Sequence, residues 1–359
     1  MKHLFALFGF IIISAGHLFG QGSGPGNFID SFVSKHNFNG TVLIEQKSAS
    51  TYHKSYGLAN MEFKVANTND MRYKVASITK MFTSTLIMQL VEKGLIDLEK
   101  PFNTYLPDCK GEAAGKVTVH QLLNHTSGIA NTDTVKSLEV ALKFGVPFYQ
   151  KPRSTDELLS ICVNGKLVNQ PGKVFDYNNA DYIILGKIIE RLCHKTYEEV
   201  LKEKILLPLK MENSGLLYQK DIIANLADTY MYRDDIKQMV PDLPVYPENW
   251  YAAGAMYSTA TDLLKFTDAL FAGKLVKQES LNRMFVSGLG EYGFGVWVYE
   301  NYDINGKMYR IVKRPGLIMG AQAMMFHVLG EGTTIIILSN TATTSLDEFA
   351  AELAKQVVR

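Results

Sequence analysis

The sequence predicts a mixed α/β (α+β) fold in which both ends of the chain build one sheet and the middle forms a mostly helical lobe. Six strand-like runs lie near the two ends, at residues 41–45, 51–58, 292–299, 308–312, 321–329 and 333–338. The middle of the chain instead has the 3.6-residue periodicity of amphipathic helices. A hydrophobic content of 47% and a charged content of 20% are typical of a globular protein.

The first 21 residues have the pattern of an export signal. A basic start at Lys2 and His3 precedes an apolar run over residues 4–13 and several small residues that suit cleavage. The apolar run is shorter than the roughly 20 residues that a membrane-spanning helix needs. We therefore expect residues 1–21 to be a signal peptide, the protein to be secreted or periplasmic, and no segment to span a membrane.

The helices can be placed in order along the chain. A short helix is expected at residues 28–36, before the first pair of strands. Apolar residues recur at helical spacing from Ile78 to Leu90, and Gly94 suits a helix end, which predicts a helix over residues 77–93. Further helices are predicted at residues 119–123, 155–163, 182–192, 197–206 and 346–358.

Charge and cysteine content exclude several classes of function. The formal net charge is +1 and there is no dense run of Lys or Arg, so neither nucleic acid nor an anionic membrane is an expected partner. The three cysteines, Cys109, Cys162 and Cys193, are too few for a disulfide scaffold, although one disulfide is possible. Their spacing resembles no metal cluster, and we expect neither a metal nor a cofactor.

One Ser-x-x-Lys tetrad, Ser77-Ile78-Thr79-Lys80, opens the predicted helix at residues 77–93. Positions three apart lie on one face of a helix, so the Ser77 hydroxyl and the Lys80 amine are held side by side. A serine hydroxyl becomes a nucleophile when a neighbouring base takes its proton, and a desolvated or crowded lysine can be that base. Taken alone, the tetrad is more often a helix cap beside a solvated lysine.

A second candidate element is Tyr177-x-Asn179, in a loop that precedes a predicted helix. A phenol beside a lysine ammonium can be held as phenolate or can pass on a proton. An amide can orient the lysine and donate to a substrate carbonyl. A second copy of the pattern, Tyr299-Glu300-Asn301, lies where a strand runs into a turn, and we assign it a structural role.

The third candidate element covers residues 313–320, just before the strand at residues 321–329. Its glycines, Gly316 and Gly320, let a substrate approach the backbone closely. Arg314 offers a positive charge that can hold an anionic group. Alone, this segment would be an ordinary turn with solvated cations.

In this order and context, the three elements resemble the motifs of the serine β-lactamase and penicillin-binding protein superfamily. The resemblance is to the branch of class C β-lactamases, D-alanyl-D-alanine carboxypeptidases and related esterases, and it extends from about Phe28 to the C-terminus. Four stretches outside the motifs support it: residues 117–128, 185–190, 208–211 and 253–263.

The resemblance implies a β-lactamase/transpeptidase-like architecture, with an antiparallel sheet of the five-stranded type flanked by helices. It implies one catalytic domain over residues 22–359. The α/β lobe of that domain would cover about residues 27–97 and 251–359, and the helical lobe about residues 98–250.

The resemblance also implies a role for each motif residue. Ser77 would be the acylated nucleophile and Lys80 the base that activates it. Tyr177 would relay the proton and later activate water, while Asn179 would contact the substrate and Lys80. The backbone N–H groups of Ser77 and Leu317 would stabilise the oxyanion, and such donors are worth several kcal/mol.

Arg314 departs from the pattern of this family, which usually has Lys or His at that position, followed by one residue and the glycine that is Gly316 here. Arginine suits a carboxylate and effectively never gives up its proton, which favours a substrate with a carboxylate near the scissile bond. Pro315 has no backbone N–H, so a strand beside the cleft lacks one hydrogen-bond donor at this position. A strand tolerates this only where the position faces the cleft or a bulge and not a paired strand. His125 and Ser127 look catalytic by residue type, but in this family their stretch is a structural turn.

The sequence thus predicts a secreted serine hydrolase that works through an acyl-enzyme on a small-molecule or peptide substrate. The substrate could be a D-Ala-D-Ala-type peptide, a β-lactam or a small ester. Arg314 leaves open an alternative, a catalytically weak penicillin-binding or sensor-like module with the same fold. A Ser-His-Asp hydrolase of the α/β-hydrolase type would need a Gly-x-Ser-x-Gly elbow, which does not occur in the sequence. The metalloprotease and nucleotide-binding motifs are absent as well.

Overall fold

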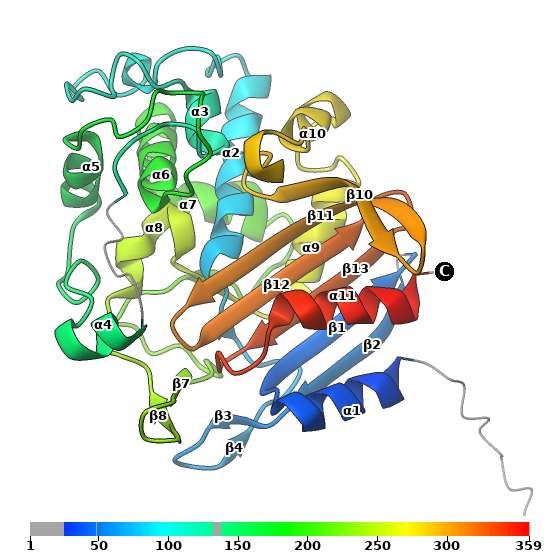
Figure 1. The fold of residues 1–359 in the computed structure, drawn as a ribbon. Helices are drawn as coiled ribbons and strands as arrows, with labels where there is room; N and C mark the ends of the chain where they lie inside the picture. The colour runs from blue at the N-terminus through cyan, green and yellow to red at the C-terminus, as the bar shows by residue number, and fades with distance from the viewer. Residues whose placement is uncertain (1–24, 48, 132–137, 359) are drawn as a thin grey trace, which may run out of the picture.

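The structure is a computed structural model that describes residues 25–47, 49–131 and 138–358, so the expected signal peptide at residues 1–21 lies outside it. A six-stranded antiparallel sheet crosses the molecule in the order β10-β11-β12-β13-β1-β2 (Figure 1). Its strands are β1 (Gly40–Gln46), β2 (Ala49–Tyr56), β10 (Trp297–Ile304), β11 (Lys307–Ile318), β12 (Ala321–Val328) and β13 (Thr333–Ser339). The N-terminal and C-terminal parts of the described chain meet inside the sheet, where β1 pairs with β13.

The rest of the described chain consists of helices, short strands and the turns and loops that connect them. The helices are α1 (Gly26–His36), α2 (Thr79–Glu92), α3 (Val119–Leu123), α4 (Leu138–Phe144), α5 (Thr155–Val163), α6 (Asn179–Cys193), α7 (Tyr197–Leu201), α8 (Tyr251–Gly254), α9 (Ala260–Phe271), α10 (Gln278–Met284) and α11 (Leu346–Val357). The 3-10 turn η1 (Ala76–Ile78) leads into α2. Small sheets are formed by β3 (Leu58–Asn60) with β4 (Val65–Ala66), by β5 (Tyr73–Lys74) and β6 (Gly215–Leu216) with β9 (Met256–Ser258), and by β7 (Tyr230–Arg233) with β8 (Gln238–Pro241).

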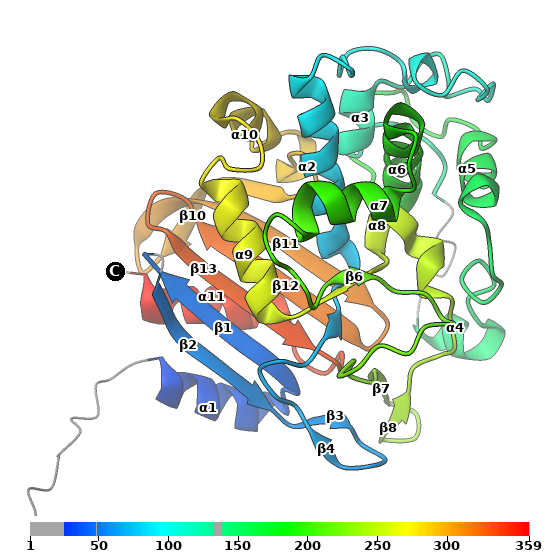
Figure 2. The same ribbon diagram turned by 180° about the vertical axis from the view of Figure 1, so that it is seen from behind.

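The alternation of side chains along the central strands divides the hydrophobic core into two layers. Val42 and Ile44 of β1 pack in the layer of α1 and α11, which cover one face of the sheet (Figure 1). Leu43, between them, belongs to the layer of α2 and α9 on the other face (Figure 2). Because helices cover both faces, β13 is buried at every position, as a doubly covered strand must be.

Helix α2 lies at the centre of the molecule, between the sheet and helices α6 and α8 (Figure 1). It is buried at every position from Thr79 to Met88. Phe82 of α2 stacks on Phe266 of α9, with ring centroids 3.7 Å apart. A helix that is buried on all sides shields its polar side chains from water, and this applies to Lys80.

The predicted α/β fold is confirmed, with several differences of detail. Each of the six predicted strand runs overlaps a strand of the sheet, which has six strands where the five-stranded type was expected. The predicted run at residues 308–312 is longer and reaches Ile318, so that β11 includes the third motif. Strand β10 begins at Trp297 rather than at residue 292. The β7–β8 hairpin lies in the middle region, for which the sequence predicted helices.

Two further expectations concern cysteines and membranes. Cys109, Cys162 and Cys193 are all free thiols, so the disulfide that the sequence allowed is not formed. Within residues 25–47, 49–131 and 138–358, no helix has the length and apolar character needed to span a bilayer.

Candidate active site

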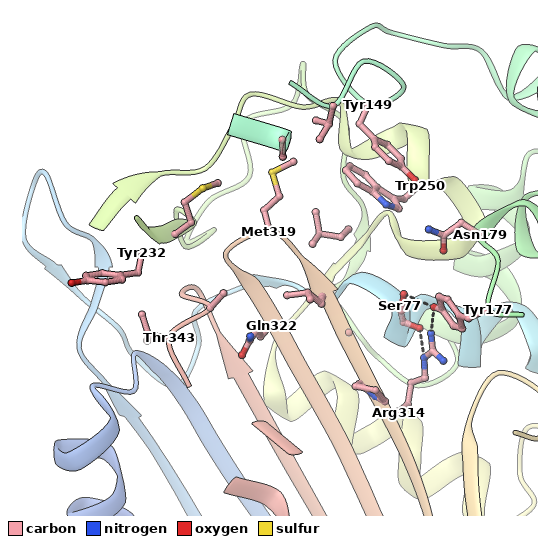
Figure 3. Close-up of a pocket in the computed structure, with 18 of the residues that line it drawn as sticks. Ser77, Tyr149, Tyr177, Asn179, Tyr232, Trp250, Arg314, Met319, Gln322 and Thr343 are labelled. Atoms are coloured by element: carbon pink, nitrogen blue, oxygen red, sulfur yellow. Dashed lines mark hydrogen bonds between the residues drawn. The ribbon is translucent and has the colours of Figure 1, made fainter. Parts of the chain in front are cut away.

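A cleft of about 1090 Å³ opens where the end of β11 meets the start of α2 and the loop before α6 (Figure 3). Six of the seven residues that the sequence predicted for the site line this cleft: Ser77, Tyr177, Asn179, Arg314, Gly316 and Leu317. The seventh, Lys80, is fully buried directly behind Ser77. The structure therefore brings together residues from three distant parts of the chain.

Ser77 lies in η1, the turn that leads into α2. Ala76, before it, has a φ of 48°, a left-handed conformation that is uncommon for a residue with a Cβ. The Tyr177 hydroxyl donates a hydrogen bond to Ser77 Oγ at 2.8 Å (Figure 3). Lys80 Nζ donates a second one at 3.2 Å. A serine hydroxyl between a phenol and an amine has a direct path for its proton.

The buried ammonium of Lys80 is held by acceptors on two other elements. It donates to Asn179 Oδ1 at 2.6 Å and to the carbonyl oxygen of Ala253 at 2.9 Å. It also lies 4.7 Å from the centroid of the Tyr177 ring. Together with Ser77 Oγ, these acceptors satisfy the three N–H groups of an ammonium, which makes its burial tolerable.

Tyr177 lies between two cations, which changes its acidity. The guanidinium of Arg314 donates to the Tyr177 hydroxyl at 2.5 Å, and Lys80 lies against the ring. Burial alone would raise the pKa of Tyr177, but the charges of Arg314 and Lys80 outweigh burial and lower that pKa to about 8. A phenol with such a pKa is partly ionised near neutral pH and can accept the proton of Ser77.

Arg314 is placed differently from what the sequence suggested. Its side chain is fully buried, with Nε donating to the carbonyl oxygen of Ser77 at 2.7 Å and one Nη donating to the hydroxyl of Tyr292 at 2.7 Å. The other Nη is the donor to Tyr177. The guanidinium is thus directed at the backbone of Ser77 and at two phenols, not at open space where a substrate carboxylate could reach it.

Gly316 and Leu317 lie on the edge of β11 that faces the Ser77 turn. A Cβ at Gly316 would lie 2.4 Å from the carbonyl oxygen of Val75, so only glycine lets the strand approach this turn so closely. Pro315 pairs with Met324 of β12 on one side only, because β10 stops pairing with β11 at Lys313. The missing N–H of Pro315 is therefore tolerated at an unpaired edge.

His125, which the sequence assigned to a structural turn, holds the loop that carries Tyr177. Its carbonyl oxygen accepts from the Asp176 N–H at 2.9 Å, and its Nδ1 accepts from the Asn178 N–H at 3.3 Å. The His125 ring is fully buried, lies 4.4 Å from the Tyr177 ring, and has its Nδ1 2.9 Å from Asp181 Oδ2. Burial, together with the charges of Lys80 and Arg314, lowers the pKa of His125 well below its usual value, which keeps the ring neutral.

Sequence reasoning did not find two residues of the site, Tyr292 and Trp297. Tyr292 accepts from Arg314, and Trp297 stacks on the Tyr177 ring with centroids 6.0 Å apart and planes 15° apart. The alternation of glycine and aromatic residues over residues 292–297 was the available signal, but the sequence predicted only a strand there.

Comparisons with known proteins agree on one family. A family model described as "Beta-lactamase" matches residues 27–359. The chain is 30% identical over 336 residues to penicillin-binding protein 4* of Bacillus subtilis, which covers 87% of this chain and 70% of that protein. It is 25% identical over 288 residues to the teichoic acid D-alanine hydrolase of Staphylococcus aureus, over 78% of this chain and 68% of that protein.

A solved structure shows the same fold. The D-amino acid amidase from Ochrobactrum anthropi superposes with a TM-score of 0.76 at 22% identity. The match covers 92% of this chain and 98% of the amidase.

Proposed function

The chain belongs to the beta-lactamase family, whose members are serine hydrolases, and we propose that Ser77 is the nucleophile that forms an acyl-enzyme with an amide or ester substrate. One observation carries this proposal. Ser77 Oγ, at the wall of the cleft, accepts hydrogen bonds from both the Tyr177 hydroxyl and the Lys80 ammonium. The names of the relatives support it, since the D-alanine hydrolase and the D-amino acid amidase are hydrolases.

Acylation would use Tyr177 in its phenolate form as the base. The phenolate takes the proton of Ser77 while Ser77 Oγ bonds to the carbonyl carbon of the substrate. The oxygen that becomes negative is stabilised by the backbone N–H groups of Ser77 and Leu317. The intermediate then breaks its bond to the amine or alcohol, which leaves with the proton that Tyr177 held.

Deacylation would repeat these steps with water. Tyr177 takes a proton from a water molecule, whose oxygen bonds to the acyl carbon. The bond between that carbon and Ser77 Oγ breaks, and the serine oxygen recovers a proton from Tyr177. The products are a carboxylic acid and the free enzyme.

We assign the base to Tyr177 and give Lys80 an electrostatic role, which differs from the sequence prediction that Lys80 is the base. Lys80 has an acceptor for each of its three N–H groups: Ser77 Oγ, Asn179 Oδ1 and the Ala253 carbonyl. Such a set of acceptors stabilises the charged ammonium, which has no lone pair to take a proton. The charge of Lys80 then stabilises the phenolate of Tyr177.

We propose that residues 1–21 direct export, that residues 22–359 act outside the cytoplasm as one catalytic domain, and that the substrate is a small molecule or peptide. The names of the relatives point to D-alanyl esters, D-amino acid amides and penicillins as substrates to test.

The test is active-site labelling combined with a substrate panel. Purified protein is treated with a fluorophosphonate probe and with fluorescent penicillin, and is assayed with nitrocefin, a p-nitrophenyl ester and a D-amino acid amide. We expect stoichiometric labelling and turnover that both disappear in Ser77→Ala. Ser160→Ala, at an exposed position on α5, is the matched control and should behave like wild type.

Two outcomes would contradict the proposal in different ways. Labelling that persists in Ser77→Ala would remove Ser77 as the nucleophile. A single burst of product without further turnover on any substrate would favour the sensor-like alternative, because acylation would then occur without deacylation.

A further inference from the structure

We propose that the cleft selects esters or amides that carry a bulky apolar acyl group and no carboxylate on the leaving group. This inference rests on the proposed acyl-enzyme function and specifies its substrate class. It replaces the sequence expectation that Arg314 binds a carboxylate of the substrate.

The guanidinium of Arg314 already has hydrogen-bond acceptors within the protein. Its three nitrogens donate to the Ser77 carbonyl and to the hydroxyls of Tyr292 and Tyr177, at 2.5–2.7 Å. The rings of Tyr177, Tyr292 and Trp297 enclose it, with their centroids 5.2–5.9 Å from the guanidinium carbon. The exposed fraction of Arg314 is 0%, so a substrate carboxylate could reach it only by displacing one of the rings that enclose it.

The described lining of the cleft carries little positive charge. Among the described residues that line it, Arg314 is the only one with a positively charged side chain. The negatively charged Asp234 also lines the cleft, directly beyond the β7 strand that carries Tyr232, and Tyr232 lies far from Ser77 (Figure 3). A carboxylate that enters the cleft would lose water and find no accessible cation among these residues, which costs binding energy.

An apolar wall lines the Asn179 side of the cleft. Tyr149 and Trp250 stack with ring centroids 3.7 Å apart and planes 3° apart. Ile318 and Met319, at the end of β11, pack against the same hydrophobic cluster. Figure 3 shows Tyr149 and Trp250 on the side of the cleft where Asn179 lies.

The wall is held in place by buried hydrogen bonds. The Asn249 side chain is fully buried and donates to the carbonyl oxygens of Phe148 and Lys151, at 2.9 and 2.8 Å. The Tyr246 N–H donates to the carbonyl oxygen of Tyr149 at 2.8 Å. An acyl group bonded to Ser77 can therefore bury apolar surface on a rigid wall, which strengthens binding without a further ordering cost.

The first experiment compares two substrates that differ in one charge. A phenylacetyl depsipeptide with a free carboxylate on the leaving group and its methyl ester are assayed at low and high salt with the same enzyme. We expect kcat/KM to favour the methyl ester by at least about tenfold, because the carboxylate is left without a partner. The preference should change little with salt. A preference of the same size for the carboxylate would overturn the inference.

The second experiment tests the apolar wall. Wild type should prefer p-nitrophenyl phenylacetate over p-nitrophenyl acetate, and Trp250→Leu should lower kcat/KM for phenylacetate by about tenfold or more while acetate changes little. Tyr232→Ala, at the far end of the same cleft, is the matched control and should keep the wild-type preference. Fluorophosphonate labelling of each variant confirms that it folds. An equal loss with both esters in a labelled Trp250→Leu would overturn the role of the wall.

The outcomes also separate this inference from the proposed function. Ser77-dependent turnover with a preference for carboxylates would overturn the substrate class and leave the acyl-enzyme proposal standing. Absence of both labelling and turnover in wild type would overturn both.

Discussion

Arg314 and Tyr177 are linked by a hydrogen bond, and under the proposed function we expect this link to set the pH at which Ser77 reacts. Since the phenolate of Tyr177 is the proposed base, kcat/KM should rise with pH through its pKa of about 8. Of the two charged side chains that lower this pKa, Arg314 has the larger effect, and Arg314→Gln removes it. We expect the rise in kcat/KM to move to higher pH, with a loss at pH 7 of about tenfold for each pH unit of the move.

The measurement is the pH profile of kcat/KM for a neutral ester. Lys313→Gln is the matched control, because Lys313 is adjacent on β11 but donates to Asp347, away from the cleft. An unchanged profile in Arg314→Gln would show that Arg314 does not set the acidity of Tyr177.

Tyr292 contributes in a different way, because it holds Arg314 without carrying a charge. Burial raises the pKa of Tyr292 well above its usual value, so the residue stays a neutral phenol. Tyr292→Phe should leave one buried Nη of Arg314 without its acceptor and cost about 1–3 kcal/mol of stability. The charge beside Tyr177 remains, so the pH profile should keep its position. Urea unfolding measures the loss of stability, and the pH profile of kcat/KM measures the acidity of Tyr177. A profile that shifts as far as that of Arg314→Gln would contradict the role of Tyr292 as a neutral acceptor for Arg314.

The residues of the site differ in how far the sequence could predict them. Ser77 and Lys80 are one helical turn apart, and Tyr177 and Asn179 are two residues apart, so local spacing and a family resemblance bring each pair to notice. The direction of the Arg314 side chain depends on contacts with Tyr177 and Tyr292, which are more than twenty residues away in the sequence. No local pattern contains that information.

At the scale of secondary-structure elements, the Glu45 carboxyl group of β1 interacts with the Asp268 carboxyl group of α9. Burial of Glu45, with repulsion by Asp268, raises the pKa of Glu45 to about 7. The unfolded chain would titrate near 4.5, so the folded protein retains a proton between these values. The higher pKa of Glu45 in the folded state contributes to the free energy of unfolding. This contribution is present in full below about pH 4.5 and is lost as the pH rises through 7.

We therefore expect Glu45→Gln to be more stable than wild type at pH 8, by on the order of 1 kcal/mol because water screens part of the repulsion. At pH 4 the difference should vanish. Urea unfolding at the two pH values provides the measurement, with Glu279→Gln, at an exposed position on α10, as the control. A difference that is the same at both pH values would show that the carboxyl pair does not share a proton.

The prediction of elements succeeded where hydrophobic pattern alone defines a strand or helix. The runs that became β12 and β13 are apolar because helices cover both of their faces, and this burial is visible in the sequence. The β7–β8 hairpin was not predicted, because its strands are short and mostly at the surface. The end of β11 was missed because Pro315 and Gly316 are unfavourable within a strand and are tolerated only at the unpaired edge beside Ser77.

At the scale of the whole molecule, the two faces of the sheet have different tasks. Helix α2 lies on one face of the sheet and α1 and α11 lie on the other (Figures 1 and 2). The first face is the one next to Ser77 and the cleft, whereas the second packs a hydrophobic layer between the N-terminal and C-terminal helices of the described chain. Changes on the second face should therefore affect stability and leave the chemistry intact.

Phe349 of α11 allows this division to be tested. Its fully buried ring stacks on Phe32 of α1, with centroids 4.2 Å apart, and contacts Phe38 edge-on at 5.3 Å. Phe349→Ala should lower the free energy of unfolding by about 3–5 kcal/mol, because it removes a large ring from a closed layer.

Glu352→Ala, on the same helix, breaks only a surface ion pair with Lys355 and should cost at most about 1 kcal/mol. At temperatures where each variant remains folded, kcat/KM should equal that of wild type, because neither side chain reaches the layer of α2. A tenfold loss of kcat/KM in folded Phe349→Ala would instead mean that packing on this face is transmitted through the sheet to Ser77.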